Sequence, residues 1–290
     1  MSAIIIEGRT AAAQIKADVA NKAHEYAIKW NRPLGLDVIL IGDNPASQVY
    51  IRTKQRACNL VGIRSKIHYL PPSISQTEVL TLIHQLNTSP DVQGILLQLP
   101  LPSGFDAQPL INAIDPLKDV DGLHPSNLGL LLAGRPNFIP CTPQGCLKLI
   151  QLCNEKIEGK NAVVIGRSLL VGKSISALLT NANATVTLAH SKTKNLKELC
   201  LSADILVCAI GHPCLITGEF IKPGAIVIDV GISRVIDDQN NSILKGDVDF
   251  ESVKEIAGYL TPVPGGVGPL TVAYLLANTL LAGHLQQQQS

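Results

Sequence analysis

Short β-branched runs alternate with segments of helical periodicity along most of this 290-residue chain. The first series predicts strands at 36–41, 67–70 and 94–97, and helices at 10–29, 46–61 and 76–87. A second series begins at Asn161 and predicts strands at 162–165, 184–189, 205–209 and 225–229. Strands that alternate with helices form parallel sheets covered by helices on both faces, so the alternation restricts the chain to the α/β class.

The stretch 161–180 predicts a nucleotide site, because a buried strand, a loop with two glycines and a helix follow one another there. Gly166 and Gly172 bracket the loop, and backbone without a Cβ can pass close to a phosphate. The helix expected from Ser174 offers unpaired N–H groups and the positive end of its dipole to an anion.

The length of this loop argues against a P-loop. Walker A places four residues between its first glycine and the Gly-Lys-Ser/Thr group, whereas five separate Gly166 from Gly172. The loop also lacks the G-x-G-x-x-G pattern, so a Rossmann-like interpretation rests on the strand, loop and helix context. A phosphotransferase, with Asp229 as the carboxylate that ends a Walker B strand, is a rival hypothesis that Mg-ATP binding would test.

The end of the next strand indicates which dinucleotide the loop would bind. NAD enzymes carry an acidic residue there, about 20 residues past the glycine loop, to accept from the ribose 2′-OH. This chain has His190-Ser191-Lys192 at that place, with no acid. The hydroxyl of Ser191 and the cations of Lys192 and Arg167 suit a 2′-phosphate, and hence NADP. Lys192 taken alone could equally be a solvated loop residue.

The two series of strands predict two domains. Residues 1–141 form an N-terminal parallel α/β substrate domain, and residues 142–269 form a C-terminal Rossmann-like NAD(P)-binding domain, with the active site expected in a cleft between them. A connecting helix is expected at 143–154, with Thr142 as its cap and Pro143 in its first position. The last helix, 270–285, is apolar enough to pack back onto the first domain and complete it.

Composition excludes several classes of protein. The net charge of +1 gives no reason to expect a nucleic-acid surface. No stretch approaches the ~18 apolar residues of a membrane span, and the first residues lack the basic region of a signal peptide, so we expect no membrane partner and a cytoplasmic location. Seven cysteines without a C-x-x-C pair indicate reduced thiols rather than disulfides or a metal site.

Three polar groups in the first domain could carry chemistry. Tyr50 and Lys54 are four residues apart on the helix after the first strand, so both lie on one face and can approach one substrate. Gln98 ends a strand, where parallel sheets place ligand sites. Asp121 belongs to an acidic loop, 118–122, whose carboxylates could hold an N–H-rich substrate or cap a turn. Each feature is common by itself, and Tyr50 and Lys54 could be ordinary surface residues. Their place before the glycine loop argues against short-chain dehydrogenases, where the order is reversed.

The loop TPVPGGVGPLT (261–271) completes a set of motifs that together resemble one family. The others are NPASQVYIRTK (44–54), GILLQLPLP (94–102), KDVDGLHP (118–125), PCTPQG (140–145), VVIGRS (163–168) and GAIVIDVGI (224–232). In this order, over roughly residues 4–283, they resemble the bifunctional methylenetetrahydrofolate dehydrogenase/methenyltetrahydrofolate cyclohydrolase family. The resemblance implies NADP-dependent oxidation of 5,10-methylenetetrahydrofolate and then hydrolysis of the methenyl product to 10-formyltetrahydrofolate, which serves purine biosynthesis.

The resemblance also implies roles for the substrate-side residues. Lys54 matches the catalytic group of the cyclohydrolase step, and Tyr50 matches the residue that stacks on the folate. Gln98 matches the glutamine that hydrogen-bonds near Lys54 and helps to set its protonation, and Asp121 the aspartate that anchors the pterin ring. The family's loop beside the substrate corresponds here to Pro264, Gly265, Gly266, Val267 and Gly268.

On the cofactor side, the resemblance assigns NADP contacts to Gly166, Arg167, Ser168, Ser191 and Ile232. It also implies that Asp229 is a strand-end residue near the cofactor rather than a Walker B carboxylate. Many members of the family have Pro after the basic residue at the helix start, where this chain has Ser174, which is also acceptable there. Some relatives use NAD.

The resemblance further implies tetrahydrofolate one-carbon derivatives as substrates and a homodimer. A non-catalytic NADP-binding regulator is the other rival hypothesis. Such a regulator would have no use for Tyr50, Lys54, Gln98 and Asp121 together.

Overall fold

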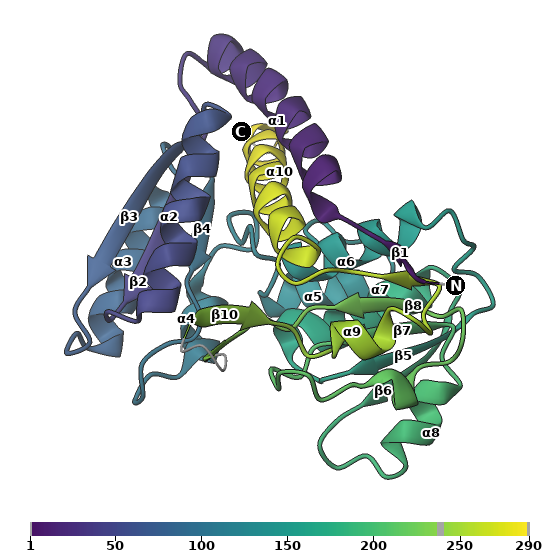
Figure 1. Cartoon of the computed structure of the whole chain (residues 1–290). Coiled ribbons are helices and arrows are strands. Elements are labelled where there is room, and N and C mark those ends of the chain that lie inside the picture. The colour runs from purple at the N-terminus through teal and green to yellow at the C-terminus, as the bar shows by residue number, and fades with distance from the viewer. Residues whose placement is uncertain (1, 237–240, 289–290) are drawn as a thin grey trace. The chain divides into compact units, whose positions relative to one another are not determined.

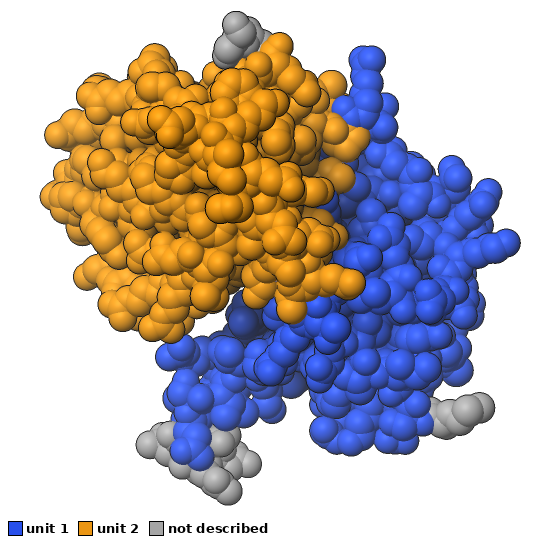
Figure 2. All heavy atoms as spheres, turned by 90° about the horizontal axis from the view of Figure 1, so that it is seen from above, with its two compact units in different colours: residues 1–12, 131–135, 140–271 blue, residues 13–130, 136–139, 272–290 orange. Residues whose placement is uncertain are grey.

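The computed structural model describes residues 2–236 and 241–288. It separates into two compact units, which Figure 2 colours separately. Unit 1 comprises residues 1–12, 131–135 and 140–271, and unit 2 comprises residues 13–130, 136–139 and 272–290. The predicted α/β class with parallel sheets is confirmed in both units.

Unit 2 is built around a parallel three-stranded sheet in the order β3-β2-β4. Its strands are β2 (Gly35–Ile41), β3 (Arg64–Leu70) and β4 (Gly94–Leu97). Every residue of β2 and β4 is buried, as expected for strands with helices on both faces. The helices are α1 (Gly8–Trp30), α2 (Pro45–Leu60), α3 (Gln76–Thr88), α4 (Ala107–Ala113), α5 (Pro125–Leu132) and α10 (Val267–Gln288), of which α1, α5 and α10 each have a few residues in unit 1.

The C-terminal part of α10 belongs to unit 2 and lies beside α1 (Figure 1). The rings of Tyr26 and His284 meet edge to face, with their centroids 5.8 Å apart. The side-chain amide of Gln286 donates to the carbonyls of Gln93 and Leu117, so the last turns are tied to the residue just before β4 and to a neighbouring loop. The expectation that the last helix packs on the first series of strands therefore agrees with these contacts.

Unit 1 contains a parallel six-stranded sheet in the order β1-β11-β8-β7-β5-β6. Its strands are β1 (Ile4–Ile5), β5 (Asn161–Ile165), β6 (Thr185–Ala189), β7 (Ile205–Cys208), β8 (Ile226–Asp229) and β11 (Tyr259–Leu260). An antiparallel hairpin joins β9 (Ser233–Ile236) and β10 (Ser242–Lys245). The helices are α6 (Cys141–Leu152), η1 (Leu169–Lys173), α7 (Ser174–Asn181), α8 (Leu196–Leu201), η2 (Gly218–Phe220) and α9 (Phe250–Val253).

The compact units differ from the predicted domain boundaries at the beginning of the chain. Residues 1–12 fall in unit 1, because β1 pairs with β11 at the edge of the six-stranded sheet. Residues 131–135 also join unit 1, where the Leu131 carbonyl accepts from the side-chain amide of Asn181. A two-residue strand leaves too weak a pattern to be found from sequence. The division into functional domains at residues 141 and 269 stays a prediction.

Two local predictions were wrong. The connecting helix begins at Cys141 after Pro140, and Thr142 does not cap it, because the Thr142 hydroxyl lies 3.2 Å from that of Thr271. The loop before Ser174 is also shorter than expected, because residues 169–173 form a turn of π-helix that runs directly into α7. Ser174 is therefore inside a continuous helical segment, where its hydroxyl donates to the Leu169 carbonyl.

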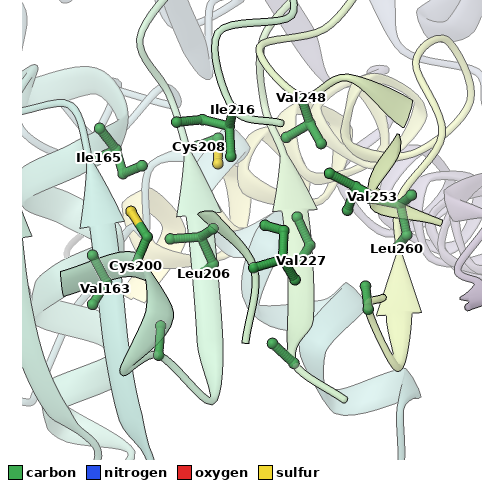
Figure 3. Close-up of a cluster of buried hydrophobic side chains, with 14 of the residues drawn as sticks. Val163, Ile165, Cys200, Leu206, Cys208, Ile216, Val227, Val248, Val253 and Leu260 are labelled. Carbon is green, nitrogen blue, oxygen red and sulfur yellow. The ribbon is translucent and has the colours of Figure 1, made fainter. Parts of the chain in front are cut away.

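The core of unit 1 forms where apolar side chains of the parallel strands meet those of the covering segments (Figure 3). Leu206 and Cys208 of β7 lie beside Val163 and Ile165 of β5 and Val227 of β8. All seven cysteines are free in the structure, and six of them are buried, as expected for packing residues. Burial raises the pKa of the Cys200 thiol to about 11, so it is a neutral packing group at neutral pH.

Leu206→Ala is expected to lower the free energy of unfolding by about 2–5 kcal/mol, because it empties volume in a close-packed core. Leu206 is 1% exposed, whereas Leu132, at 73% exposure, provides the matched control for the same substitution. Urea denaturation measures both variants. Equal effects of Leu206→Ala and Leu132→Ala would contradict the placement of this core.

Candidate active site

In unit 2, predicted site residues lie where the order of strands reverses. β2 is followed in the chain by β3 on one side and then by β4 on the other, so the reversal lies between β2 and β4. Ligands of open parallel sheets bind outside the carboxyl ends of the strands at this point. Gln98 follows the last residue of β4, and its N–H donates to the Ile39 carbonyl of β2. Its side chain therefore starts at the position where such a site is expected.

The structure brings Tyr50, Lys54 and Gln98 together. Nζ of Lys54 donates to Gln98 Oε1 at 3.0 Å and lies 4.3 Å from the centroid of the Tyr50 ring. The amide nitrogen of Gln98 donates to the Leu99 carbonyl at 2.6 Å, which fixes the orientation of the amide so that its oxygen faces Lys54. Lys54 is only 6% exposed. A long cationic side chain buried against an aromatic face and an amide is rare on a structural helix, and it is typical of a functional group.

Cys58 lies one helical turn beyond Lys54 on α2 and is fully buried. Burial raises the pKa of its thiol to about 11. The thiol therefore stays neutral and does not offer Lys54 a competing anion. The amide of Gln98 and the ring of Tyr50 are two of the groups that this amine contacts.

Asp121 is half-buried in a loop that other polar groups hold in place. Asp119, two residues earlier, is buried and accepts from the N–H of His124 at 2.7 Å and from the Asn127 side chain at 2.8 Å. Desolvation raises the pKa of the Asp119 carboxyl. Of the two roles left open for this acidic loop, Asp119 takes the structural one, which is to close the turn that carries Asp121.

Asn278 of α10 was not predicted from sequence, although it supports the same loop. Its amide donates to the Val120 carbonyl at 2.9 Å and to the Ile139 carbonyl at 3.0 Å. The available signal was a polar residue inside an otherwise apolar helical run, because such a residue is buried only when backbone groups satisfy it. Asp121 is therefore held from both sides of its own peptide segment.

In unit 1 the reversal of strand order lies between β5 and β7, and Gly166 follows β5 at that point. Gly166 has φ +114°, and a Cβ there would overlap the carbonyl oxygen of Ala209. Gly172 is equally restricted, because its Cβ would overlap the carbonyl of Gly166. The loop is thus a compact glycine-dependent turn at the carboxyl edge of the sheet, as a close approach to a phosphate requires.

Ser168 caps the helical segment that follows this turn. Its hydroxyl accepts from the N–H of Val171 at 3.2 Å, and helical backbone runs on from Leu169 through Asn181. Arg167 and Ser168 are both exposed, next to the positive end of this segment. The turn therefore presents a guanidinium, a hydroxyl and helix N–H groups, which are the donors that a phosphorylated ligand needs.

The other predicted cofactor residues are exposed on the loops after β6 and β8. Ser191 lies in a turn that two bonds hold: His190 N–H donates to the Thr193 hydroxyl, and Lys192 N–H donates to His190 Nδ1. Ile232 is 65% exposed, so its side chain is available to a ligand.

The predicted substrate loop, 264–268, joins β11 to α10. Gly265 has φ +121°, and its carbonyl accepts from the N–H of Gly8 at the start of α1. Val267 and Gly268 are the first residues of α10 rather than loop residues. Pro264 is exposed, whereas Gly265, Gly266 and Val267 are buried. Pro264 and Gly268 are therefore the residues of this group whose surface is available to a ligand.

Asp229 does not point outward as a Walker B carboxylate would. It is 3% exposed, and it accepts from the backbone N–H groups of Gly231, Asp247 and Val248 at 2.9–3.0 Å. Within residues 2–236 and 241–288, no cluster of three or more His, Cys, Asp or Glu residues could hold a metal ion. None of the helices in these ranges is both long and apolar enough to cross a membrane.

Comparison with known proteins decides the family. The model of the tetrahydrofolate dehydrogenase/cyclohydrolase catalytic domain matches residues 6–121, and that of the family's NAD(P)-binding domain matches residues 140–287. The chain belongs to the tetrahydrofolate dehydrogenase/cyclohydrolase family. The resemblance drawn from the sequence motifs is thereby confirmed.

Relatives within this family match over nearly their whole length. The bifunctional protein FolD of Polaromonas sp. is 49% identical over 280 residues, which are 97% of this chain and 98% of the relative. The crystal structure of the bifunctional FolD enzyme from Campylobacter jejuni is 42% identical, with a TM-score of 0.93 over 98% of this chain and 100% of that one. The Trypanosoma brucei FolD, solved with NADP and an inhibitor, is 36% identical, with a TM-score of 0.95 and 99% of each chain covered.

Replacing Asp229 is expected to change how stability depends on pH. Burial raises the pKa of this carboxyl from 3.8 to about 7, so between these values the folded protein binds more protons than the unfolded chain. The carboxyl's contribution to the free energy of unfolding therefore falls as pH rises from about 4 to about 7.

The difference in unfolding free energy between wild type and Asp229→Asn isolates this effect. Urea denaturation at pH 5 and at pH 8 should show that wild type loses stability relative to the variant at the higher pH. A difference that moves the other way would mean that the three N–H bonds outweigh desolvation and hold the pKa low.

Proposed function

We propose that this protein oxidises 5,10-methylenetetrahydrofolate to 5,10-methenyltetrahydrofolate with NADP and then hydrolyses the product to 10-formyltetrahydrofolate. The observation that carries the proposal is the buried Lys54–Gln98 hydrogen bond beside the Tyr50 ring, in a chain of this family. Neither a phosphotransferase nor a passive NADP-binding regulator has a use for this group. The glycine turn at 166 supplies the second requirement, a place for a dinucleotide.

On the substrate side, we assign Tyr50 to stacking on the flat folate ring and Asp121 to accepting its N–H groups. A carboxylate accepts two parallel hydrogen bonds from an amino-pyrimidine edge, which fixes orientation as well as position. Pro264, Gly265, Gly266, Val267 and Gly268 contribute the loop that passes beside the substrate. Orienting the methylene carbon in this way raises the rate of hydride transfer, because the entropy cost of aligning the reacting atoms has been met on binding.

On the cofactor side, the donors of unit 1 fit NADP. Gly166 and Ser168 leave room and N–H groups for the pyrophosphate, and Ile232 covers the cofactor with an apolar surface. Arg167 and Ser191 supply the charge and hydroxyl that bind the 2′-phosphate. When bound, NADP supplies the acceptor for the hydride that leaves the methylene carbon. The T. brucei FolD was solved in complex with NADP, which supports this choice over NAD.

The hydrolytic step falls to Lys54. The methenyl product is a cation, and a neutral amine tolerates it better than an ammonium would. A neutral Lys54 can take a proton from a water whose oxygen bonds to the methenyl carbon, and general base catalysis of this kind contributes roughly 10²–10⁴-fold. The hydroxyl adduct becomes the formyl C=O as the bond from this carbon to N5 breaks; one proton of the water ends on N5 and the other is released to solvent. Gln98 holds the amine in place through its Oε1 and helps to set the protonation of Lys54.

We also propose that the enzyme is a cytoplasmic homodimer that serves purine biosynthesis, as the sequence resemblance implies. Sedimentation equilibrium of the purified chain tests the dimer. A single species with the 30.9 kDa mass of one chain would contradict it.

The first experiment is to mix purified protein with 5,10-methylenetetrahydrofolate and NADP, with NAD in parallel. Both reduced cofactor and the methenyl chromophore are followed. Reduced cofactor without lasting methenyl supports both activities. No reduction with either cofactor would contradict the proposal and favour the regulator.

Lys54→Met is expected to leave oxidation largely intact and to slow hydrolysis by about a hundredfold or more, because the proton acceptor is gone. Methenyltetrahydrofolate should then accumulate during oxidation. Lys22→Met, an exposed lysine on α1, is the control and should behave as wild type. A Lys54→Met variant with full cyclohydrolase activity would refute the role of this amine.

Arg167→Ala is expected to raise the KM for NADP by roughly ten- to a hundredfold, because a charge-assisted hydrogen bond to the 2′-phosphate is worth about 1.5–3 kcal/mol. The KM for NAD, which lacks this phosphate, should change much less. Arg135→Ala, at another exposed arginine of unit 1, controls for loss of positive charge. Equal changes for NADP and NAD would place Arg167 away from the 2′-phosphate.

A further inference from the structure

Two buried carboxylates lie together at the carboxyl edge of the six-stranded sheet. Asp229 ends β8, and Asp247 follows β10 and is 0% exposed. Oδ1 of Asp229 accepts from the N–H of Asp247 at 2.9 Å, so the two residues are directly linked. The NADP contacts assigned above include neither residue, and the sequence motifs do not include Asp247.

Asp247 uses its whole carboxylate on one short turn. Oδ2 accepts from the N–H of Ile210 at 2.6 Å and of Gly211 at 3.2 Å, and Oδ1 accepts from the N–H of His212 at 2.9 Å. These are three consecutive backbone donors shortly after β7. Three N–H groups of one turn bonded to a single buried carboxyl group restrict the turn to one arrangement.

Asp229 in turn holds the segment that carries Asp247. Besides the N–H of Asp247, it accepts from Val248 on one side and from Gly231 on the other. A Cβ on Gly246 would overlap the Asp229 carboxylate, so only glycine allows the backbone at 246 to pass this close to that carboxylate. Six backbone N–H groups from three loops therefore converge on two carboxylates. Such complete pairing is what makes burial of two acidic residues tolerable.

The turn that Asp247 holds lies on the other side of the strand reversal from Gly166. Ala209 N–H donates to the Ile165 carbonyl at 2.8 Å, and the Ala209 carbonyl occupies the space that a Cβ on Gly166 would need. Residues 209–212 and the Gly166 turn are thus the two neighbouring loops at the point where open parallel sheets bind their ligands. Moving either loop changes the shape of that place.

We propose that Asp247 is a positioning residue for NADP: it holds the Ile210–His212 turn in the geometry that NADP binding requires, and Asp229 holds Asp247. The proposal rests on NADP being the ligand of unit 1. A turn fixed before the ligand arrives spares the ordering cost that binding would otherwise carry. The carboxylate acts through the backbone of the turn and touches no reacting atom.

Asp247→Asn tests this with almost no change of shape. An amide nitrogen at the Oδ1 position would face the His212 N–H, and at the Oδ2 position it would face those of Ile210 and Gly211. In either orientation at least one donor loses its acceptor, and the turn loosens. The matched control is Asp37→Asn in unit 2, another buried carboxylate, which is paired with Arg64 and His68.

The measurements are the Kd for NADP by calorimetry, the KM for folate, the melting temperature, and amide hydrogen exchange of residues 210–212 without ligand. Asp247→Asn is expected to raise the Kd for NADP about tenfold or more and to speed exchange in the turn. The KM for folate should stay within about twofold of wild type. Asp37→Asn should lower the melting temperature and leave the Kd for NADP unchanged.

If Asp247→Asn lowers the melting temperature but changes the Kd for NADP by no more than about twofold, Asp247 contributes to stability alone. That result would overturn the proposal. Wild-type protein that binds no NADP would instead refute the proposed function. If Asp247→Asn does not fold, Gly211→Ala perturbs the same turn. Gly211 has φ +77°, a backbone conformation that is strained for alanine. The added Cβ would meet no atom within 4 Å, so the change acts on the backbone of the turn alone. Gly211→Ala should also weaken NADP binding, and an unchanged Kd would overturn the proposal.

Discussion

Parallel strand pairing is the constraint on which the candidate site depends. Parallel strands in one sheet all end at the same edge, so the loops that follow them are neighbours even when they are far apart in sequence. Each of the two parallel sheets has a reversal of strand order, between β2 and β4 in unit 2 and between β5 and β7 in unit 1. Gln98 follows β4 and Gly166 follows β5, so each unit places a predicted site residue at its own reversal.

The edges of the sheets are also where buried polar groups accumulate. Lys54 is bound to Gln98, Asp119 to Asn127, and Asp229 to the segment of Asp247. Each of these groups would destabilise the fold if it lost its partners, because an unpaired buried charge is costly. Gln98 and Asp229 lie at the carboxyl ends of β4 and β8, where a ligand site needs a rigid, polar edge.

Much of this arrangement could be predicted from the chain itself. Strand β4 was predicted at its observed bounds, because a short apolar run between turn residues leaves little choice. The spacing of Tyr50 and Lys54 indicated one helix face, and their contact with each other follows from it. The π-helical turn at 169–173 could not be predicted, because it depends on the Ser174 hydroxyl bonding to Leu169 rather than on periodicity.

Contacts between distant segments set the limit of sequence reasoning. The pairing of β1 with β11 joins residues whose local patterns are only two residues long. The bonds of Asp247 reach back to the turn at 210–212, and no spacing rule connects these positions. Thr142 was expected to cap a helix, because the local pattern allowed it, but its hydroxyl contacts Thr271 instead. In each case a tertiary contact determined the outcome.

The support of the Asp121 loop by Asn278 has a consequence for the order in which the molecule can form during synthesis. The loop that carries Asp121 is made early, but the bond from Asn278 to Val120 spans 158 residues. A nascent chain therefore carries an incomplete substrate side while all of the nucleotide-binding strands are being translated. Contacts of such long sequence separation also slow folding, because a large loop must close before they form. The earliest part of the proposed catalytic machinery is thus among the last to become complete.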